Sequence, residues 1–410
     1  VTLVLCVSVL VKRGSSASLP SISGSIILIA AFAFAGFASA VFNSDLAGYP
    51  RYQAALIGIF LDLKVYLAAF SIFVLLGRMD PSQIERIVIY FCKLSICIAL
   101  LNLAFCLRDV LDGARDIHGR PLMLRAGLAI PNGLYPLKVQ SVYATVLGLV
   151  CAATLSLRGI RTGRYVLLSF VFFVGVVIHL SVKEIAASLA LIGLCLFLAS
   201  RTFAKLYALV WVVLIFLAVG FTDNPITNAF EDRVQVFLLN DTTETVRSAL
   251  YDRSAQIAID YFPFGSGAGT FGSMPSRDLQ YSPIYHKYGI SQLYGGYGTL
   301  ESGGEFLMGV FWPKVLAEAG MIGFSCYLLF WCRILFWAAR GAIRAPDAPS
   351  IFGFLFVAVV MIISLATPII TRADAVLPLS LALACVMQRR ASRRSAVRRL
   401  SGAHPAVLRR

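Results

Sequence analysis

Long apolar stretches separated by short basic loops make up most of this chain. The hydrocarbon core of a bilayer is about 30 Å thick, so a helix that crosses it needs about 20 apolar residues. Runs that reach or approach this length lie at 1–11, 22–42, 54–77, 87–106, 139–157, 165–182, 185–200, 205–221, 315–338, 351–369 and 374–388. The sequence therefore predicts an all-α, polytopic integral membrane helical bundle with about 11 transmembrane helices.

The first of these runs is shorter than the others and begins at Val1 rather than at a methionine. We therefore expect the natural chain to start earlier, and about 12 transmembrane helices is the alternative count. No stretch of the sequence shows an internal repeat. Because such repeats are typical of inverted-repeat transporters, the sequence does not support that architecture.

Basic residues in the loops predict the orientation of the chain, because loops rich in Lys and Arg stay in the cytoplasm. The segment 389–410 contains eight arginines and no acid, which predicts a cytoplasmic tail. Counting back through the helices places a loop at 107–138 and a long loop at 222–314 on the outer face. The predicted organisation is eight helices in 1–221, the outer loop 222–314, three helices in 315–388 and the tail 389–410.

The long outer loop contains the pattern of an amphipathic helix. Asp241 can cap its start, and Glu244 stands at the reciprocal position of a capping box. The apolar residues that follow recur at helical spacing, at Val246, Leu250, Ile257 and Tyr261. We expect this helix to stop at Pro263.

A glycine turn follows the predicted helix. Its glycines are Gly265, Gly267, Gly269 and Gly272. Glycine lets the backbone adopt conformations in which successive amides point to one side, and such amides bind anions. We therefore expect the amides of this turn to be free to face an anion.

Composition excludes two classes of protein. Hydrophobic residues make up 59% of the chain and the mean hydropathy is +0.80, which excludes a soluble globular protein. The net charge of +15 invites a nucleic-acid interpretation, but the basic residues lie in short loops and the tail, which indicates membrane topology. The nine cysteines lie in or beside apolar segments, without disulfide or metal spacing. We expect no nucleic-acid partner, no metal and no cofactor.

Charged residues inside the predicted helices are costly and therefore informative. Asp62, Lys64 and Lys93 lie within spans. Two interpretations of these charges are open. They pair with one another across neighbouring helices, or they bind substrate. Lys183 lies where two spans meet at the outer face, where snorkelling of its side chain is the alternative to a function.

Three sequence pieces, in this order, resemble the O-antigen polymerase and ligase superfamily, with the Wzy-type polysaccharide polymerases as the closer branch. The first is the outer link that begins Ser181-Val-Lys183 and opens a helix of small residues. The second is an arginine followed by an aromatic residue and Pro-x-Gly-x-Gly, namely Arg247, Tyr251, Pro263, Gly265 and Gly267. The third is the return to the membrane from Trp312 through Glu318 to Gly323.

The resemblance implies a metal-independent glycosyltransferase of the bacterial inner membrane, acting at its periplasmic face. It would polymerise oligosaccharide units carried on undecaprenyl pyrophosphate into O-antigen, capsule or exopolysaccharide. The expected partners are this lipid-linked glycan, membrane lipid and a chain-length regulator protein. The alternatives are a ligase that transfers the glycan to lipid A-core or another acceptor and, in another class, a transporter or flippase for an anionic or lipid-linked solute.

The site residues expected from the resemblance and from the chemistry fall into two groups. The catalytic candidates are Arg247, Arg253, Lys183, His286, Glu301 and Glu305. The candidates for binding pyrophosphate or substrate are Arg247, Lys183, Gly265, Gly267, Gly269, Tyr251 and Glu318. Arginine suits the pyrophosphate leaving group because its planar fork binds phosphate oxygens bidentately.

Two points leave alternatives open. Family members carry His or Asp about nine positions before the re-entry glutamate, where this chain has Gly309, so the proton acceptor must lie elsewhere or be absent. His286, Glu301 and Glu305 are the candidates. Arg247 and Arg253 are alternatively solvated helix arginines neutralised by nearby acids.

Overall fold

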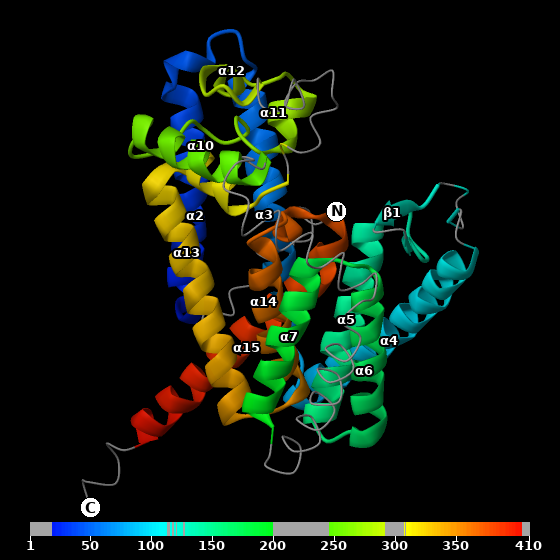
Figure 1. Cartoon of the computed structure of the whole chain (residues 1–410). Helices are drawn as coiled ribbons and strands as arrows, with labels where there is room; N and C mark the ends of the chain where they lie inside the picture. Colours follow the sequence, from blue (N-terminus) through cyan, green and yellow to red (C-terminus); the bar gives the residue numbers. More distant parts are fainter. Residues whose placement is uncertain are drawn as a thin grey trace, which may run out of the picture. The chain divides into compact units, whose positions relative to one another are not determined.

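The computed structural model describes residues 19–112, 115–116, 119, 121–125, 128–199, 246–291, 307 and 309–403 (Figure 1). The expected spans at 1–11 and 205–221 lie outside the described residues. The chain forms two compact units. The first comprises Val1–Arg78, Glu244–Trp337 and Ser364–Arg410, and the second comprises Met79–Thr243 and Ala338–Ile363.

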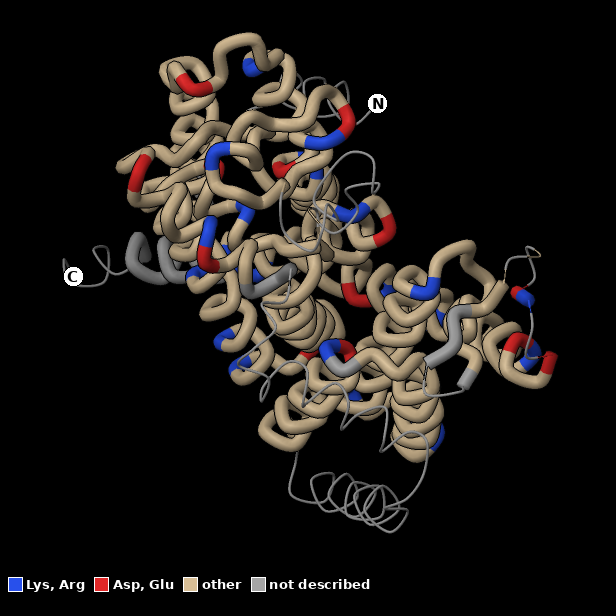
Figure 2. The backbone as a smooth tube through the Cα atoms, turned by 45° about the horizontal axis from the view of Figure 1, so that its top comes forward, with Lys and Arg blue, Asp and Glu red and all other residues tan. Residues whose placement is uncertain are grey.

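Five described helices are long and apolar enough to cross a membrane. They are the segment Ser23–Phe42 of α2 (Leu19–Phe42), α3 (Arg51–Leu76), α4 (Pro81–Asp112), α5 (Lys138–Leu157) and α13 (Trp312–Arg344). They coincide with five of the predicted spans, which confirms a helical membrane protein. In Figure 2, long stretches of helical backbone are free of charged residues.

Four further helices lie at predicted spans. They are α6 (Thr162–Ile178), α7 (Val182–Leu198), α14 (Ala348–Ser364) and α15 (Ala373–Ala403). Of these, α6 and α14 are apolar but shorter than the five long helices. The number of membrane crossings therefore stays a prediction.

In the first unit, α3 packs against α2 and α15. Aromatic side chains fill the space between α3 and α13, where the Tyr66 and Tyr327 hydroxyls lie 2.5 Å apart. The ring of Trp331 is fully buried and contacts both tyrosines. Buried tyrosine hydroxyls require a hydrogen-bond partner, and here each supplies it to the other.

The polar segment of the first unit folds into short helices at one end of α2 and α3. These are α10 (Val246–Asp260), α11 (Met274–Asp278) and α12 (Pro283–Lys287), with the 3-10 turn η1 (Ser44–Leu46) beside them (Figure 1). Their shared core includes Leu250, Ile257, Phe271 and Tyr285, all fully buried. The predicted apolar stripe is thus confirmed at Leu250 and Ile257, whereas the expected cap at 241–244 lies outside the described residues.

In the second unit, α5 packs between α4 and α6 and contacts α7. The segment 107–138 differs from the predicted loop, because α4 continues to Asp112. A short antiparallel hairpin follows, formed by β1 (Met123–Arg125) and β2 (Leu128–Ile130). Asp109 stabilises the return of the chain, since its carboxylate accepts hydrogen bonds from the amides of Asn132 and Gly133.

Candidate functional site

The glycine turn packs against a break in α13. At Gly320 the backbone leaves the helical conformation, with φ 62° and ψ −169°. A break in a helix leaves carbonyl groups without their usual partners. The amide of Ser266 donates to the carbonyl of Ala317 at 2.8 Å, and the amide of Gly267 donates to that of Glu318 at 3.0 Å. The turn therefore completes the hydrogen bonding of the broken helix.

The same turn lies directly on the backbones of α2 and α3. The amide of Ala268 donates to the carbonyl of Gly36 at 2.9 Å. A Cβ at Gly267 would lie 2.6 Å from the Cα of Ala40, and a Cβ at Gly269 would lie 2.3 Å from the carbonyl oxygen of Ala54. Glycine is required at these positions because any side chain would collide with a helix backbone.

This arrangement corrects the expectation that the amides of the turn are free to bind an anion. The amides of residues 265–268, 271 and 272 all donate to protein acceptors, and the turn is buried. Two of these donors, the amides of Ser266 and Gly267, are taken by carbonyls of the broken helix. The other four are taken by the carbonyls of Tyr261 and Gly36, the carboxylate of Glu318 and the hydroxyl of Tyr285. Gly265, Gly267 and Gly269 thus belong to the scaffold beneath a site rather than to a phosphate-binding surface.

Three polar side chains near the end of α2 and in the link after it hold the turn from the other side. The Ser39 hydroxyl donates to the carbonyl of Gly265. The Asn43 side-chain amide donates to Ser266 at 2.8 Å, and the Tyr49 hydroxyl donates to Gly269 at 2.7 Å. These residues were not predicted from the sequence, because a single polar residue at the end of an apolar run has no spacing signal.

A buried charge cluster lies under the turn. Lys314 donates to the carboxylate of Asp62 at 2.5 Å and lies 4.0 Å from that of Glu318. All three residues are at most 5% exposed. Pairing of Asp62 across neighbouring helices is one of the two interpretations given above. The structure supplies the partner, Lys314, which no spacing in the sequence indicates.

Glu318 also accepts a hydrogen bond from the amide of Phe271, at 3.0 Å from Oε1. Its carboxylate is therefore occupied on one side by the glycine turn and faces Lys314 on the other. The expectation that Glu318 contacts substrate stays a prediction. Its geometry is that of an anchor between α13 and the turn.

An exposed network of charged and aromatic residues lies at the surface of the same unit. Lys287 donates to Asp45 at 2.7 Å and to the Tyr261 hydroxyl at 3.0 Å, and Tyr261 donates to Asp45 at 2.5 Å. Hydrogen bonds from Lys287 and Tyr261 lower the pKa of Asp45, and the bond to Asp45 raises the pKa of Lys287. Desolvation, followed by the bond to Asp45, raises the pKa of Tyr261.

Besides the glycines of the turn, four of the predicted site residues lie in α10 and α12 of this unit. Tyr251 is partly exposed, and its hydroxyl donates to the carbonyl of Leu365 at 2.6 Å. Arg253 is half-buried and donates to Gln256 at 3.1 Å, and His286 is exposed, with its ring 5.1 Å from that of Tyr281. Arg247 lies in the first turn of α10, but its side chain is outside the described residues. Glu301 and Glu305 are outside them as well.

Lys183 belongs to the second unit, in the first turn of α7. Its ammonium lies 3.7 Å from the carboxylate of the adjacent Glu184. Glu184 is fully buried and accepts a hydrogen bond from Ser181. The cation predicted in this link is therefore held beside an acid of the same turn.

His179, at the end of α6, is fully buried in the second unit. Its Nδ1 lies 2.7 Å from the carbonyl of Gly175, and its Nε2 lies 2.9 Å from the Ser141 hydroxyl. The carbonyl can only accept, so Nδ1 carries the proton in the neutral ring and Ser141 donates to Nε2. Both ring nitrogens are satisfied, which is the arrangement of a structural histidine.

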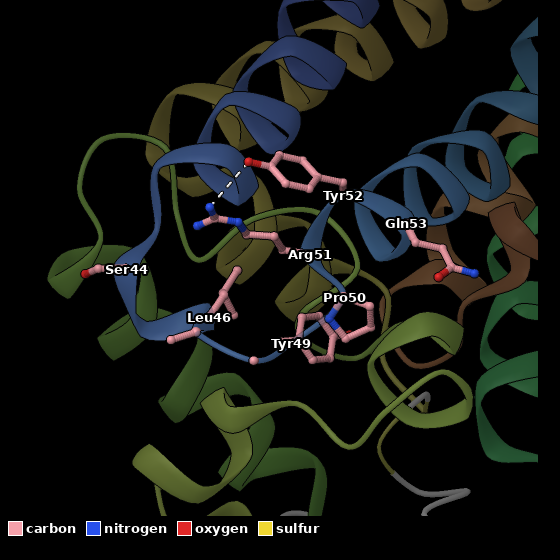
Figure 3. Close-up of a pocket in the computed structure, with 9 residues that line it drawn as sticks. Ser44, Leu46, Tyr49, Pro50, Arg51, Tyr52 and Gln53 are labelled. Atoms are coloured by element: carbon pink, nitrogen blue, oxygen red, sulfur yellow. Dashed lines mark hydrogen bonds between the residues drawn. The ribbon is translucent and has the colours of Figure 1, made fainter.

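A surface groove of about 460 Å³ follows the link between α2 and α3 (Figure 3). It is lined by residues 44 and 46–53, among them Tyr49, Arg51 and Tyr52. Arg51 donates to the carbonyl of Asn43 at 3.2 Å and to the Tyr52 hydroxyl at 3.3 Å. Tyr49 lines the groove and also donates a hydrogen bond to the carbonyl of Gly269, so the groove and the glycine turn share this residue.

The described residues include no group of three or more His, Cys, Asp or Glu side chains that could hold a metal ion. No protein-family model matches the chain, and no relative is found among curated proteins. The family resemblance therefore rests on the three sequence pieces and on the predicted topology.

Proposed function

We propose that this protein transfers glycan from a lipid pyrophosphate donor to a sugar hydroxyl, as a polymerase of lipid-linked repeat units at the outer face of the bacterial inner membrane. One observation supports this more than any other. The second and third sequence pieces, about 50 residues apart, are in direct contact, through Ser266 and Ala317, Gly267 and Glu318, and Phe271 and Glu318. Pieces that serve one site are expected to meet in this way.

The reaction itself needs no metal or external energy. The acceptor hydroxyl oxygen forms a bond to the anomeric carbon of the donor, and the bond from that carbon to the pyrophosphate oxygen breaks. The pyrophosphate leaves with the electron pair, and the acceptor proton passes to a base. Cations near the leaving group lower the barrier because negative charge grows there as the bond breaks.

The roles of the residues follow from their positions. Arg247 and Arg253 on α10 are the proposed ligands of the pyrophosphate, and Arg51 adds a cation in the groove of Figure 3. Tyr52, which lines this groove and is exposed, offers a ring on which a sugar face can stack. His286 is the exposed candidate for the base among the described residues, beside the predictions Glu301 and Glu305. Lys183 stays a predicted ligand of the pyrophosphate.

The experiment uses the full chain reconstituted in vesicles with a lipid-linked repeat unit, followed by separation of the products by length. Growth of a ladder of repeat lengths supports the polymerase. A single transfer to lipid A-core indicates the ligase. Movement of the lipid-linked unit across the bilayer without bond formation indicates a flippase and rejects the proposal.

A further inference from the structure

Two faces of α10 are apolar, and only one of them packs into the core of the first unit. Leu250 and Ile257 form the packed face and are fully buried. The other apolar side chains recur at spacings of four, four and three and are exposed, namely Tyr251, Ala255, Ile259 and Phe262. Phe262 continues the last turn of the helix, since its amide donates to the carbonyl of Ile259 at 3.2 Å. Because a helix turns once in about 3.6 residues, these four side chains form one exposed stripe.

Polar side chains occupy the third face of α10. Asp252, Gln256 and Asp260 each follow a residue of the exposed stripe by one position, and all three are exposed. Neighbouring residues lie about 100° apart around a helix, so the exposed stripe separates the buried face from this polar face. A helix with this order of faces is suited to a boundary between an apolar medium and water.

The C-terminal end of the exposed stripe is joined to α13. The amide of Ile322 in α13 donates to the carbonyl of Pro263 at 3.3 Å. The residues on either side of this proline, Phe262 and Phe264, are exposed, and Phe262 is 70% exposed. Met321 and Ile322 are exposed as well. The apolar surface of the stripe therefore continues onto the surface of α13.

The length of α13 indicates where this surface lies in a bilayer. α13 is long and apolar enough to cross a membrane, and Arg340 is an exposed charge near its C-terminal end. Met321 precedes Arg340 by 19 positions, or about 29 Å of helix, which is close to the hydrocarbon thickness of about 30 Å. One other charged residue lies between them, Arg333, whose guanidinium carbon lies 4.5 Å from the centroid of the Trp337 ring. We therefore expect Met321 to lie at the outer edge of the hydrocarbon core.

The N-terminal end of the stripe also contacts an exposed apolar residue. The Tyr251 hydroxyl donates to the carbonyl of Leu365 at 2.6 Å, and Leu365 is exposed in the link that leads toward α15. In Figure 1, α10 lies across the upper end of α13 rather than along it. A helix in this position lies along the membrane surface when α13 crosses the membrane.

We propose that the exposed stripe of α10 is a membrane-surface contact, with Ile259, Phe262 and Phe264 inserted into the outer interface of the bilayer. Apolar and aromatic side chains anchor a helix at this level, with its polar face toward water. The partner is the lipid surface rather than another protein, because the stripe continues the surface of α13 that we expect to face lipid. The proposal does not depend on the transferase function, since it rests on the exposure and packing of α10 alone.

The test measures the surroundings of two neighbouring residues, Ala255 on the stripe and Gln256 on the polar face. Each is replaced by cysteine in the full chain, labelled with the fluorophore bimane and reconstituted in phosphatidylcholine vesicles. One quencher is iodide on both sides of the membrane, and the other is a phosphatidylcholine with a nitroxide near the headgroup end of its acyl chain. The labelled wild type measures the background from the native cysteines, which is subtracted.

We expect opposite results at the two positions. The nitroxide lipid should quench the label at Ala255→Cys strongly, and iodide should quench it weakly. At Gln256→Cys iodide should be the stronger quencher. Phe262→Cys supplies a second position on the stripe and should behave like Ala255→Cys.

Stronger quenching by iodide than by the nitroxide lipid at the stripe positions would overturn the proposal. So would the same ratio of the two quenchers at Ala255 and Gln256. Shielding of the stripe from both quenchers would mean that protein covers it, for example a second copy of the chain, and would overturn the proposal as well. The elution profile and the thermal unfolding midpoint in detergent show whether each variant is folded, and a folding defect at one stripe position leaves the other as the test.

Discussion

The carboxylate of Glu318 accepts a hydrogen bond from the backbone amide of Phe271 at 3.0 Å, across 47 positions of sequence. This contact joins α13, which is long and apolar enough to cross a membrane, to the glycine turn of the polar segment. On its other side Glu318 faces Lys314, which is bonded to Asp62 of α3. One buried cluster therefore ties two apolar helices to the segment that is proposed to carry the chemistry.

Lys314→Met should strongly destabilise the protein. The change leaves Asp62 and Glu318 as buried carboxylates without their cation, and removing one partner of a buried ion pair costs about 3–5 kcal/mol. The thermal unfolding midpoint of the purified protein in detergent measures this loss. The matched control is Lys287→Met, whose partner Asp45 is 41% exposed and whose loss should cost about 0–1 kcal/mol. Equal shifts in the two variants would contradict the cluster's structural role.

Gly267→Ala and Gly289→Ala form a second matched pair, because both glycines have positive φ, 109° and 68°. At Gly267 the added Cβ would lie 2.6 Å from the Cα of Ala40, whereas at Gly289 nothing lies within 4 Å. We expect Gly289→Ala to cost about 1–2 kcal/mol through backbone strain alone. Gly267→Ala should cost considerably more and reduce the yield of folded protein. Similar unfolding midpoints for the two variants would show that the turn does not pack on α2.

Arg247→Lys and Arg247→Ala should both abolish visible polymer. Lysine keeps the charge but lacks the bidentate fork. Loss of one preorganised donor to developing charge costs on the order of 3 kcal/mol, or about a hundredfold in rate. Product length and amount are measured at matched protein abundance. Arg277→Ala, whose guanidinium already pairs with Asp278 at 2.5 Å, is the control and should be mild. Wild-type polymer from Arg247→Ala would place the site elsewhere.

The Asp45–Lys287 pair predicts a defined pH dependence. The lowered pKa of Asp45 contributes stability that is present above its unfolded value of about 3.9 and is lost as the pH falls through the folded pKa. The raised pKa of Lys287 contributes stability that is present below about 10.4 and is lost as the pH rises through the folded pKa.

The unfolding midpoints of wild type and Asp45→Asn should therefore differ by a constant amount between about pH 4 and pH 10. The difference should shrink at lower pH, where wild-type Asp45 is itself neutral. Asp252→Asn, at another exposed acid of the same unit, controls for the change in net charge. If the difference between the two unfolding midpoints grew toward acid pH, it would contradict a stabilising role of the Asp45–Lys287 pair.

The topology is testable with cysteines at Met274 and Ser392, both exposed. The positive-inside rule predicts that the former faces the periplasm and the latter the cytoplasm. A membrane-impermeant thiol reagent should therefore label Met274→Cys in intact cells and Ser392→Cys only in inverted vesicles. The wild type measures the background from the native cysteines, of which Cys97 and Cys332 are exposed. Labelling of both variants from one side would reject the orientation.

The apolar pattern by itself determined where the long helices lie, because a bilayer requires runs of a set length. It also determined which face of α10 is buried, since Leu250 and Ile257 recur at helical spacing. It failed at the end of α4, where the apolar run stops near Cys106 but the helix continues to Asp112. There Arg108 and Asp112 pair at 3.2 Å and extend the helix with charged residues.

Only the tertiary structure decided what the polar residues of the candidate site do. It showed that amides of the glycine turn donate to α13 and α2, and that Glu318 accepts one of these hydrogen bonds. It also paired Lys314 with Asp62 across 252 positions and brought Tyr49 to Gly269 across 220. The spacing of residues along the sequence predicts which side chains share one face of a helix, because the backbone sets the period of the helix. Contacts between distant segments depend on how helices pack, and no spacing in the sequence records them.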